Sequence, residues 1–548
     1  MSASPFRLLP HFTLVFVGLF TIAFFLFAHE GLYDYDDYNY ARYAHQLATG
    51  TFDLAPNPGH LDYTPLHQRL MVFGPVALFY KLLGIRIFTT TIWPLLCTLG
   101  TSLIFYLLYR QRAPVVASAA MLLLGLHYFT LNLSIYLYPD NVLMFFAAGS
   151  AAALLHGRRA TQGQPVWWGV GFALLNFVAL LSKETIVYYL PFYLGVLLLD
   201  VWHRRHGKFW LAALSIGGVL LVSYLFVYQV AANDVLYRFR VIESVNEVRK
   251  IGNTSTGDIV ARITYMPLQL LVGTGLGVVL LLVIVAAIKS NKLSSDARFW
   301  LALAGSSLAF YWLGSTSLSY YNPNSLLPRM LTPLLPPLCL AAGFGLDYFA
   351  RTGRSGWLLA LGLLGCAAWL RSSISIVYGL LGGFFALAAV LRFVSVGRKK
   401  IERYGPGTVI FASATLVALG LIMALRPAYF MTKPSNSGYF AQQRIIHQEL
   451  RGPAGGVVLM DNFSLHKCEI MYGFQVPNGL RFHPYTAYDT LRKVPGRPIW
   501  LLINRPVLSN DELIPQVINE SAEQVLTRFP RRKLHAQDNG VELYLLQD

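Results

Sequence analysis

Two adjacent acids, Asp36 and Asp37, are the residues of this sequence best suited to chemistry. They follow the first long apolar segment and open an expected helix around 37–49, with Tyr40 one turn after Asp36 on the same side. A carboxylate in this place can accept a proton from a hydroxyl or an amine as a general base. The two acids can instead cap the helix N-terminus, where the helix dipole favours negative charge. Capping explains one acid well and the second less well, so both interpretations stay open.

Further ionisable residues stand where apolar segments begin or break. Asp140 opens one segment, Lys183 and Glu184 separate two others, and Arg329 opens a proline-rich one. Ionisable groups at membrane depth are costly and usually face a cavity or each other. Lys183 suits an anionic head group. Arg329 suits a phosphate group, because the geometry of a guanidinium favours that pairing. The alternatives are a helix cap for Asp140, a local ion pair for Lys183 with Glu184, and snorkelling to the interface for Arg329.

Two more cations, Lys81 and Arg86, flank a short apolar segment at 70–83. The segment is too short to cross a bilayer, and we expect it to lie in the interface. The two cations are either ordinary head-group anchors or further phosphate contacts. Acids in one loop and cations in others together suit a site for a lipid-phosphate leaving group beside a general base.

The composition is that of a polytopic membrane protein, which must position these residues. Of the 548 residues, 55% are hydrophobic and only 13% are charged. The net charge of +17 then indicates basic cytoplasmic loops and no nucleic-acid partner. The four cysteines show no metal or redox spacing, so we expect no disulfide framework.

About 13 apolar segments approach the length of about 20 residues that crosses a membrane. Basic residues such as Arg110 and Arg112 gather at alternate ends of the segments, which should therefore be cytoplasmic. An odd number of spans puts the N-terminus inside and the C-terminal tail outside. The expected spans are 12–29, 87–109, 115–132, 141–157, 165–182, 186–201, 209–230, 263–288, 299–315, 328–349, 356–371, 375–391 and 408–426.

The composition changes after about Pro427, which divides the chain into a membrane domain, 1–426, and a soluble domain, 427–548. The membrane domain includes a long first outward loop, 30–86, with a Pro/Gly turn at 56–59. In the tail, apolar runs between turn signals predict strands, and 512–527 reads as a helix. The expected strands are Gly456–Met460, Ile499–Ile503 and Val541–Leu546.

The order of motifs over roughly 10–350 resembles the GT-C superfamily of integral-membrane glycosyltransferases. It is most similar to the branch of bacterial lipid A aminoarabinose transferases and protein O-mannosyltransferases. Three positions depart from the family pattern: Thr64 stands where a Lys is frequent, Leu66 replaces a second Pro, and Met330 replaces a Tyr. Lys81 or Arg69 is a candidate substitute for that Lys, unless the donor differs. The motifs are Asp-Asp-Tyr-Asn-Tyr-Ala at 36–41, Tyr-Thr-Pro-Leu at 63–66, Asp-Asn-Val-Leu at 140–143, Leu-Leu-Ser-Lys at 180–183 and Pro-Arg-Met-Leu-Thr-Pro at 328–333.

The resemblance implies an all-α polytopic membrane protein of the GT-C fold, with about 13 transmembrane helices and a small C-terminal α/β periplasmic domain. It further implies transfer of a sugar from a polyprenyl-phosphate donor to lipid A, another envelope glycan or a protein, by one inverting displacement. Asp36 inherits the role of general base and Asp37 a supporting one. Arg86, Lys183 and Arg329 would stabilise the departing phosphate. The remaining residues expected at the substrate are Tyr40, Lys81, Asp140 and Glu184.

No cofactor is strictly required, because side-chain cations can offset a lipid monophosphate; a divalent metal at Asp36 and Asp37 stays open. The expected location is the bacterial inner membrane, in multiple passes, with the site on the periplasmic face and membrane lipids as partners. Two alternatives remain. A flippase of lipid-linked sugars predicts inverted repeats, which are not visible. A GT-C-type ligase that moves a polymer from a lipid diphosphate is kept open by the polar loop at 231–262.

Overall fold

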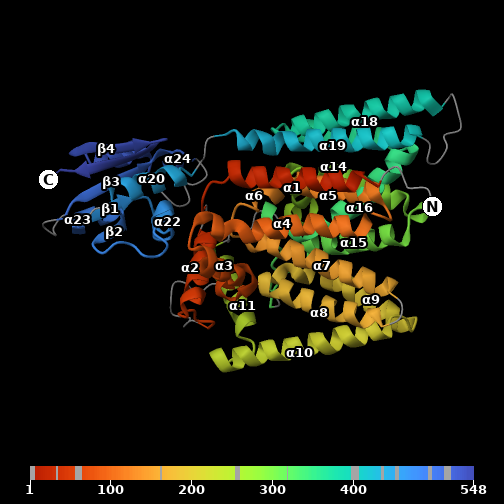
Figure 1. Cartoon of the computed structure of the whole chain (residues 1–548), viewed down its shortest axis with the longest axis horizontal. Coiled ribbons are helices and arrows are strands. Elements are labelled where there is room, and N and C mark those ends of the chain that lie inside the picture. Colours follow the sequence, from red (N-terminus) through yellow and green to blue (C-terminus); the bar gives the residue numbers. More distant parts are fainter. Residues whose placement is uncertain are drawn as a thin grey trace.

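The computed structural model describes residues 7–32, 35–55, 65–160, 163–252, 259–317, 319–396, 406–433, 437–450, 456–491, 497–510 and 520–547. Figure 1 shows a bundle of helices that run in roughly one direction, with a sheet domain at one end. The N-terminus lies at the opposite end of the bundle, so the termini are separated along the long axis of the molecule.

Each expected span coincides with a helix or with two consecutive helices. Among the described residues, eight helices are long and apolar enough to cross a membrane, or nine if one bent pair counts as a span. The other expected spans correspond to α5, α7, α15 and α17, which run in the same bundle but are too short or too polar by that measure. The bundle helices are α1 (Leu9–Phe27), α4 (Ile87–Tyr109), α5 (Pro114–Gly125), α6 (Tyr128–Asn132), α7 (Pro139–Arg159), α8 (Gln164–Ser182), η2 (Glu184–Tyr189), α9 (Leu190–Trp202), α10 (Gly207–Ala232), α12 (Ile259–Thr264), α13 (Met266–Gly273), α14 (Gly277–Ile288), α15 (Ser295–Leu313), η4 (Pro328–Leu334), α16 (Leu335–Thr352), α17 (Gly356–Leu370), α18 (Ile374–Val396) and α19 (Pro406–Met431).

The centre of the bundle is built around α5, α14 and α16, whose side chains are buried almost throughout. Small residues let these helices approach closely: a Cβ on Gly345 of α16 would lie 2.1 Å from the carbonyl oxygen of Leu282 in α14. In contrast, α10 exposes large apolar side chains such as Leu211 and Val222, as expected of a helix that faces lipid.

The expected span at 263–288 is not continuous. It is broken into α13 and α14, which meet at an angle of 111°. The break contains Gly275, whose φ of +101° is a left-handed conformation that favours glycine. Tyr378 of α18 supports the break, because its hydroxyl accepts a bond from the Gly277 amide (2.9 Å) and donates to the Val272 carbonyl (2.6 Å).

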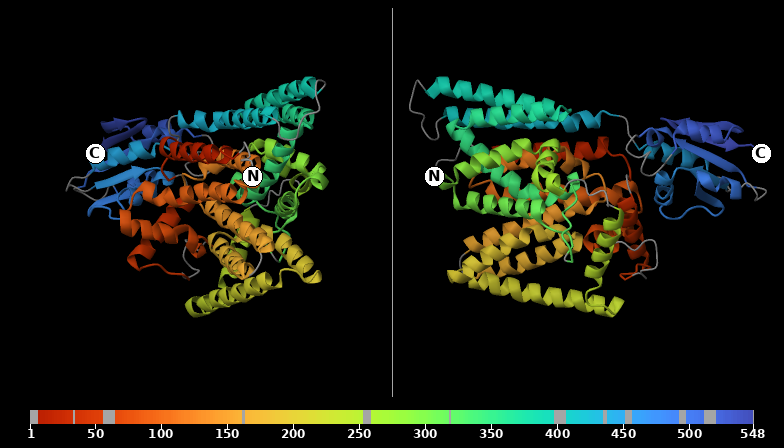
Figure 2. Two further views of the ribbon diagram at one scale, coloured as in Figure 1. Left: turned by 45° about the vertical axis from the view of Figure 1, so that its right-hand side comes forward. Right: turned by 180° about the vertical axis from the view of Figure 1, so that it is seen from behind.

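A layer of shorter helices lies at the end of the bundle nearest the sheet domain, as Figures 1 and 2 show. We call it the outward layer, after the loops that were expected to face outward. Its helix α2 (Tyr35–Thr49) matches the helix expected there, and α3 (Leu70–Leu83) matches the segment expected in the interface. The layer also contains η1 (Pro65–Gln68) and α11 (Tyr237–Gly252). The expected Pro/Gly turn at 56–59 lies outside the described residues.

The C-terminal domain contains a five-stranded sheet in the order β2-β1-β3-β5-β4. β1 pairs in parallel with β2 and β3, whereas β3, β5 and β4 pair antiparallel. The three expected strands are confirmed; β2 and β4 were not expected. Of the helix expected at 512–527, the structure describes its last part in α25. The elements are α20 (Tyr439–Glu449), β1 (Gly456–Met460), α21 (Asn462–Leu465), α22 (Lys467–Met471), β2 (Leu480–Pro484), α23 (Tyr488–Leu491), β3 (Ile499–Asn504), α24 (Arg505–Leu508), α25 (Ala522–Arg528), β4 (Arg532–Asp538) and β5 (Val541–Leu546).

The boundary between the two parts lies later than the composition suggests, since α19 continues through Pro427 to Met431. The sheet domain also contacts the outward layer directly. Tyr38 of α2 donates a hydrogen bond to Glu469 of α22 (2.6 Å), and the His45 ring stacks on Phe474 with centroids 4.6 Å apart. Helix α2 is therefore held between the bundle and the sheet domain.

Candidate active site

Asp36 forms an ion pair with Arg329, a residue that is distant in the sequence. Arg329 Nη1 lies 2.9 Å from Asp36 Oδ2, and the guanidinium also lies over the Tyr138 ring, 5.2 Å from its centroid. Asp36 is in the first turn of α2 and Arg329 in the first turn of η4. The side chains are 22% and 27% exposed, so both can be reached from outside. The pair excludes snorkelling as the sole role of Arg329.

A second pair, between Lys183 and Asp140, is almost fully buried. Lys183 Nζ lies 2.6 Å from Asp140 Oδ1 and 3.3 Å from the Met330 sulfur. The side chains of Lys183 and Asp140 are 5% and 1% exposed. Asp140 Oδ2 has no hydrogen-bond partner among the described residues, although it is buried. Asp140 is therefore the counter-ion of Lys183, and its second carboxylate oxygen remains available to accept a hydrogen bond.

The third group is centred on Arg69, which joins η1 to α3. Arg69 donates to the Tyr40 hydroxyl (2.7 Å) and to Glu184 Oε2 (3.0 Å). Burial lowers the pKa of Arg69, but Glu184 and Tyr40 outweigh this effect, so the net pKa is raised. Burial also raises the pKa of Tyr40, which Arg69 offsets only in part. Arg69 is therefore fixed as a cation and Tyr40 as a neutral hydroxyl.

Glu184 joins this group to the polar loop through Arg238 of α11. Arg238 Nη2 donates to Glu184 Oε1 (2.8 Å) and to the Leu180 carbonyl (2.9 Å), while Nη1 donates to the Tyr224 hydroxyl (2.9 Å). Lys183 and Glu184, although adjacent, thus face different partners and do not form the local pair that the sequence allowed. The break between α8 and η2 directs the two charges apart.

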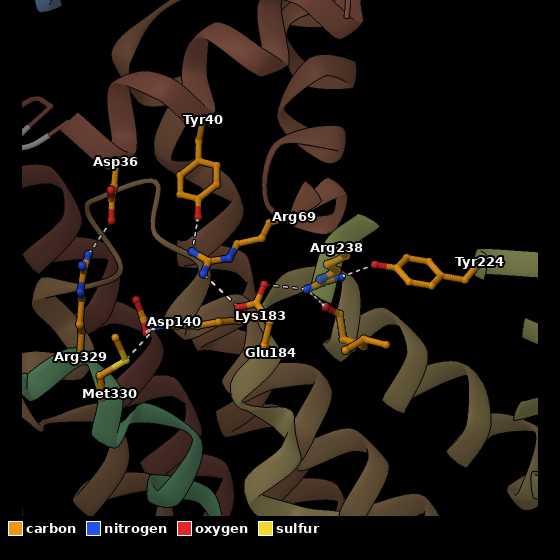
Figure 3. A network of polar contacts seen from close by, with 11 residues as sticks. Asp36, Tyr40, Arg69, Asp140, Lys183, Glu184, Tyr224, Arg238, Arg329 and Met330 are labelled. Carbon is orange, nitrogen blue, oxygen red and sulfur yellow. Dashed lines mark hydrogen bonds and ion pairs between the residues drawn. The ribbon is translucent and has the colours of Figure 1, made fainter. Parts of the chain in front are cut away.

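The three groups converge in one place, as Figure 3 shows. Arg69 and Arg329 are close enough to Lys183 to repel its charge, and Asp140 attracts Arg329. Four cationic side chains face three carboxylates there, which leaves an excess of one positive charge. An accessible acid beside crowded, partly neutralised cations can accept a proton and hold an anion at the same time.

Three of the expected site residues do not join this network. Asp37 is fully buried and interacts electrostatically with Tyr439 of the sheet domain. Lys81 and Arg86 are exposed on either side of the α3–α4 turn. Arg86, expected at the departing phosphate, therefore lies outside the network, whereas Arg69 lies in it. The roles expected of Asp37 and Arg86 stay predictions.

Arg238 is the functional candidate that the sequence analysis missed. It lies in a charged stretch of α11, where one more arginine carries no special signal. Met330 was noted only as a departure from the family pattern, yet its sulfur contacts Lys183. Of the two substitutes considered for the missing family Lys, Arg69 lies in the network.

The described residues contain no group of three His, Cys, Asp or Glu side chains that could hold a metal ion. Asp36 and Asp37, the pair for which a metal was left open, face different surroundings: Asp36 pairs with Arg329, and Asp37 is buried beside the sheet domain. That the reaction requires no metal ion stays a prediction.

Comparison with known proteins gives one family match and several matches of fold. Residues 68–228 match the family model described as dolichyl-phosphate-mannose-protein mannosyltransferase. No curated protein sequence matches the chain.

Among solved structures, the fold is similar to that of ArnT from Cupriavidus metallidurans, determined bound to undecaprenyl phosphate and in the apo state. Both comparisons have a TM-score of 0.54 and 16% identity and cover 98% of each chain. The fold is also similar to the oligosaccharyltransferase of Archaeoglobus fulgidus in the apo form, with a TM-score of 0.50 and 9% identity over 98% of this chain and 74% of that one. The chain therefore has the GT-C fold of integral-membrane glycosyltransferases, with an ArnT-like arrangement along nearly its whole length.

Proposed function

We propose that this protein transfers a sugar from a polyprenyl-phosphate donor to an acceptor of the cell envelope: lipid A, another glycan or a protein. The observation that carries the proposal is the ion pair of Asp36 with Arg329, placed beside the buried cation Lys183 and the Arg69–Glu184 pair. The family match over 68–228 and the ArnT-like fold support it.

In the proposed reaction, an acceptor hydroxyl attacks the anomeric carbon from the face opposite the lipid phosphate. The new bond joins the acceptor oxygen to the sugar, and the bond between the sugar and the phosphate oxygen breaks. Its electron pair leaves with the phosphate, while the proton of the hydroxyl passes to the Asp36 carboxylate. The products are the glycosylated acceptor and free polyprenyl phosphate, with inversion at the anomeric carbon.

The ion pair explains how donor binding prepares the base. Without a ligand, Arg329 is neutralised by Asp36. A donor phosphate offers Arg329 a second anion, and a guanidinium binds phosphate through two parallel hydrogen bonds. Arg329 then turns toward the phosphate and frees Asp36 to take a proton. Lys183, held by Asp140, adds a second positive charge where negative charge develops.

The arrangement of the chain supports a periplasmic site in a bacterial inner membrane. The outward layer and the sheet domain share one end of the bundle, opposite the N-terminus (Figure 1). The basic residues just after α4 and in the last turn of α7 have the bias expected at the cytoplasmic ends of spans. In this orientation the donor enters from the outer leaflet.

The test measures release of free polyprenyl phosphate by the purified full-length protein, given a panel of undecaprenyl-phosphate sugars and envelope acceptors. We expect one donor to be consumed, and Asp36→Asn to reduce release by at least ~100-fold, because the amide cannot take the proton. Asp538→Asn is the matched control, since Asp538 forms an exposed pair with Arg444 in the sheet domain. Unchanged release by Asp36→Asn would refute the assignment of the base. Release of polyprenyl diphosphate from diphosphate-linked glycans, with no polyprenyl phosphate released from the monophosphate donors, would favour the ligase.

A further inference from the structure

A narrow crevice lies beside the C-terminal end of α19 and shares no residue with the network of Figure 3. Its walls come from the break between α13 and α14, the start of α18, the α5–α6 junction and α19. Among its lining residues, one is permanently charged, Arg426, and none is acidic.

Arg426 has a half-buried guanidinium, two of whose nitrogens are buried and unpaired. Its Nε and Nη1 atoms are inaccessible to solvent and have no hydrogen-bond partner among the described residues. The guanidinium lies over the rings of Tyr128 and Phe129, 4.6 Å and 5.5 Å from their centroids. Such ring contacts stabilise a cation, but they satisfy none of its hydrogen-bond donors. A snorkelling arginine would place these nitrogens in water, which is not the case here.

No lining carboxylate balances this cation. Helix ends of both signs meet at the crevice, because α14 and α18 start beside it while α5 and α13 end there. The first amide of α14, that of Gly277, is already bonded to the Tyr378 hydroxyl. Arg426 is therefore the group that favours an anion, and the anion supplies the hydrogen-bond acceptor that the guanidinium lacks.

The surroundings indicate that this anion carries an apolar tail. On the outer side of α19, Leu421, Leu425 and Tyr429 are exposed large side chains, as expected for a surface that contacts lipid. The crevice is narrow, so a bound lipid must lie mostly outside it, along the helices. A phosphate ester on a lipid meets both conditions, since arginine pairs readily with phosphate.

We propose that the Arg426 crevice is a binding site for the phosphate group of a lipid, separate from the site at Asp36. The guanidinium of Arg426 donates to the phosphate oxygens. The lipid tail packs along the exposed side of α19. The site does not depend on the reaction proposed above, because none of its residues belongs to that network.

The test compares thermal unfolding of the purified full-length protein with phosphatidylglycerol and with phosphatidylcholine of the same acyl chains. A ligand that binds the folded state raises Tm with its concentration. We expect phosphatidylglycerol to raise Tm by several degrees and phosphatidylcholine to have little effect. Arg426→Gln should lose this difference. Arg371→Gln, which removes an exposed cation three residues before Ile374, should keep it.

Parallel additions of undecaprenyl phosphate and inorganic phosphate identify the source of the phosphate. An Arg426-dependent shift with either lipid supports the site, and the larger shift names the preferred ester. An equal shift with inorganic phosphate alone would overturn the lipid assignment. An unchanged phosphatidylglycerol effect in Arg426→Gln would overturn the site itself. If that variant does not fold, native mass spectrometry of the wild type decides: equal retention of both phospholipids refutes the proposal.

Discussion

The buried pair of Lys183 and Asp140 shows how single residues set the stability of this site. Replacing Lys183 with Met leaves the Asp140 carboxylate buried without its counter-ion. Breaking a buried pair in this way costs about 3–5 kcal/mol. We expect Lys183→Met to lower the free energy of unfolding by that amount, measured by denaturation in detergent, and Lys183→Met with Asp140→Asn to recover part of it.

The control for this prediction is the exposed pair of Arg444 with Asp538 in the sheet domain. Exposed pairs contribute about 0–1 kcal/mol, so Arg444→Met should change stability little. Equal losses for Lys183→Met and Arg444→Met would show that burial of the Lys183 pair has no energetic consequence.

Asp461, in the sheet domain, gives a prediction about pH. It caps α21 by accepting a hydrogen bond from the Ser464 amide (2.7 Å), but burial raises the pKa of its carboxyl. A raised pKa in the folded state means that ionisation of Asp461 opposes folding, so this contribution to stability grows as pH falls toward 4. Asn caps helices as well as Asp and carries no charge.

We therefore expect Asp461→Asn to be more stable than the wild type at pH 7, with the gain shrinking as the pH approaches 4. Thermal unfolding followed between pH 4 and pH 8 measures the difference. A gain that is constant over this range would contradict the role of ionisation. Asp538→Asn, at an exposed pair, should show no comparable pH-dependent gain.

At the residue scale, the sequence identified most of the site because ionisable side chains are rare in apolar segments. Asp140, Lys183, Glu184 and Arg329 stood out for that reason. Asp36 stood out as one of two adjacent acids at the start of a helix, and all five residues lie in the network. In the outward loops charges are common, so the same argument could not choose between cations there. Which of them points inward is decided by tertiary packing.

At the scale of elements, α2 depends on the sheet domain for its position. Tyr38 lies two residues after Asp36 and donates to Glu469 of α22, and His45 stacks on Phe474 farther along the helix. Gly31, just before α2, has a φ of +80°, and a Cβ there would lie 2.2 Å from the Tyr439 ring. Glu469 is thus a positioning residue for the helix that carries Asp36, the proposed base.

We expect Glu469→Ala to reduce kcat by roughly 10-fold with little change in KM for the donor, because small misplacement of a reacting group costs rate. Glu469→Gln keeps an acceptor for Tyr38 and should retain most of the activity. Glu449→Ala, which removes an exposed contact with His535, is the control. A rise in the KM for the donor with an unchanged kcat would indicate that Glu469 affects donor binding instead of the position of α2.

Elements with a clear apolar pattern were predicted well, such as α3 and the three inner strands. The two strands that were missed lie at the edges of the sheet. β4 is mostly exposed and rich in charge, so it lacks the alternation that marks a half-buried strand. The break at Gly275 was missed because the apolar run continues through it, although glycines on both sides of Thr274 were a signal.

At the scale of the whole molecule, orientation in the membrane is the property to test. Single cysteines placed at opposite ends of the bundle report it: Asn291→Cys between α14 and α15, and Ser509→Cys in the sheet domain, both at exposed positions. With the sheet domain in the periplasm, an impermeant maleimide labels Ser509→Cys in intact spheroplasts. Asn291→Cys is labelled only after the membrane is disrupted.

The parent protein gives the background from its own four cysteines, three of which are buried. The reverse labelling pattern would place the Asp36 site on the cytoplasmic side and remove the basis for an outer-leaflet donor. The overall architecture was predictable because span length and charge bias act on the chain as a whole. How the spans pack around α16 was not, since it depends on contacts such as that of Gly345 with Leu282.

The pair of Asp36 and Arg329 also has a consequence for biosynthesis. A ribosome delivers the acid early and its guanidinium partner only after most of the bundle has entered the bilayer. A nascent chain that ends before Arg329 therefore has Asp36 without its partner. On the proposed function, such a chain cannot use a sugar donor, so incomplete copies would not consume the carrier lipid.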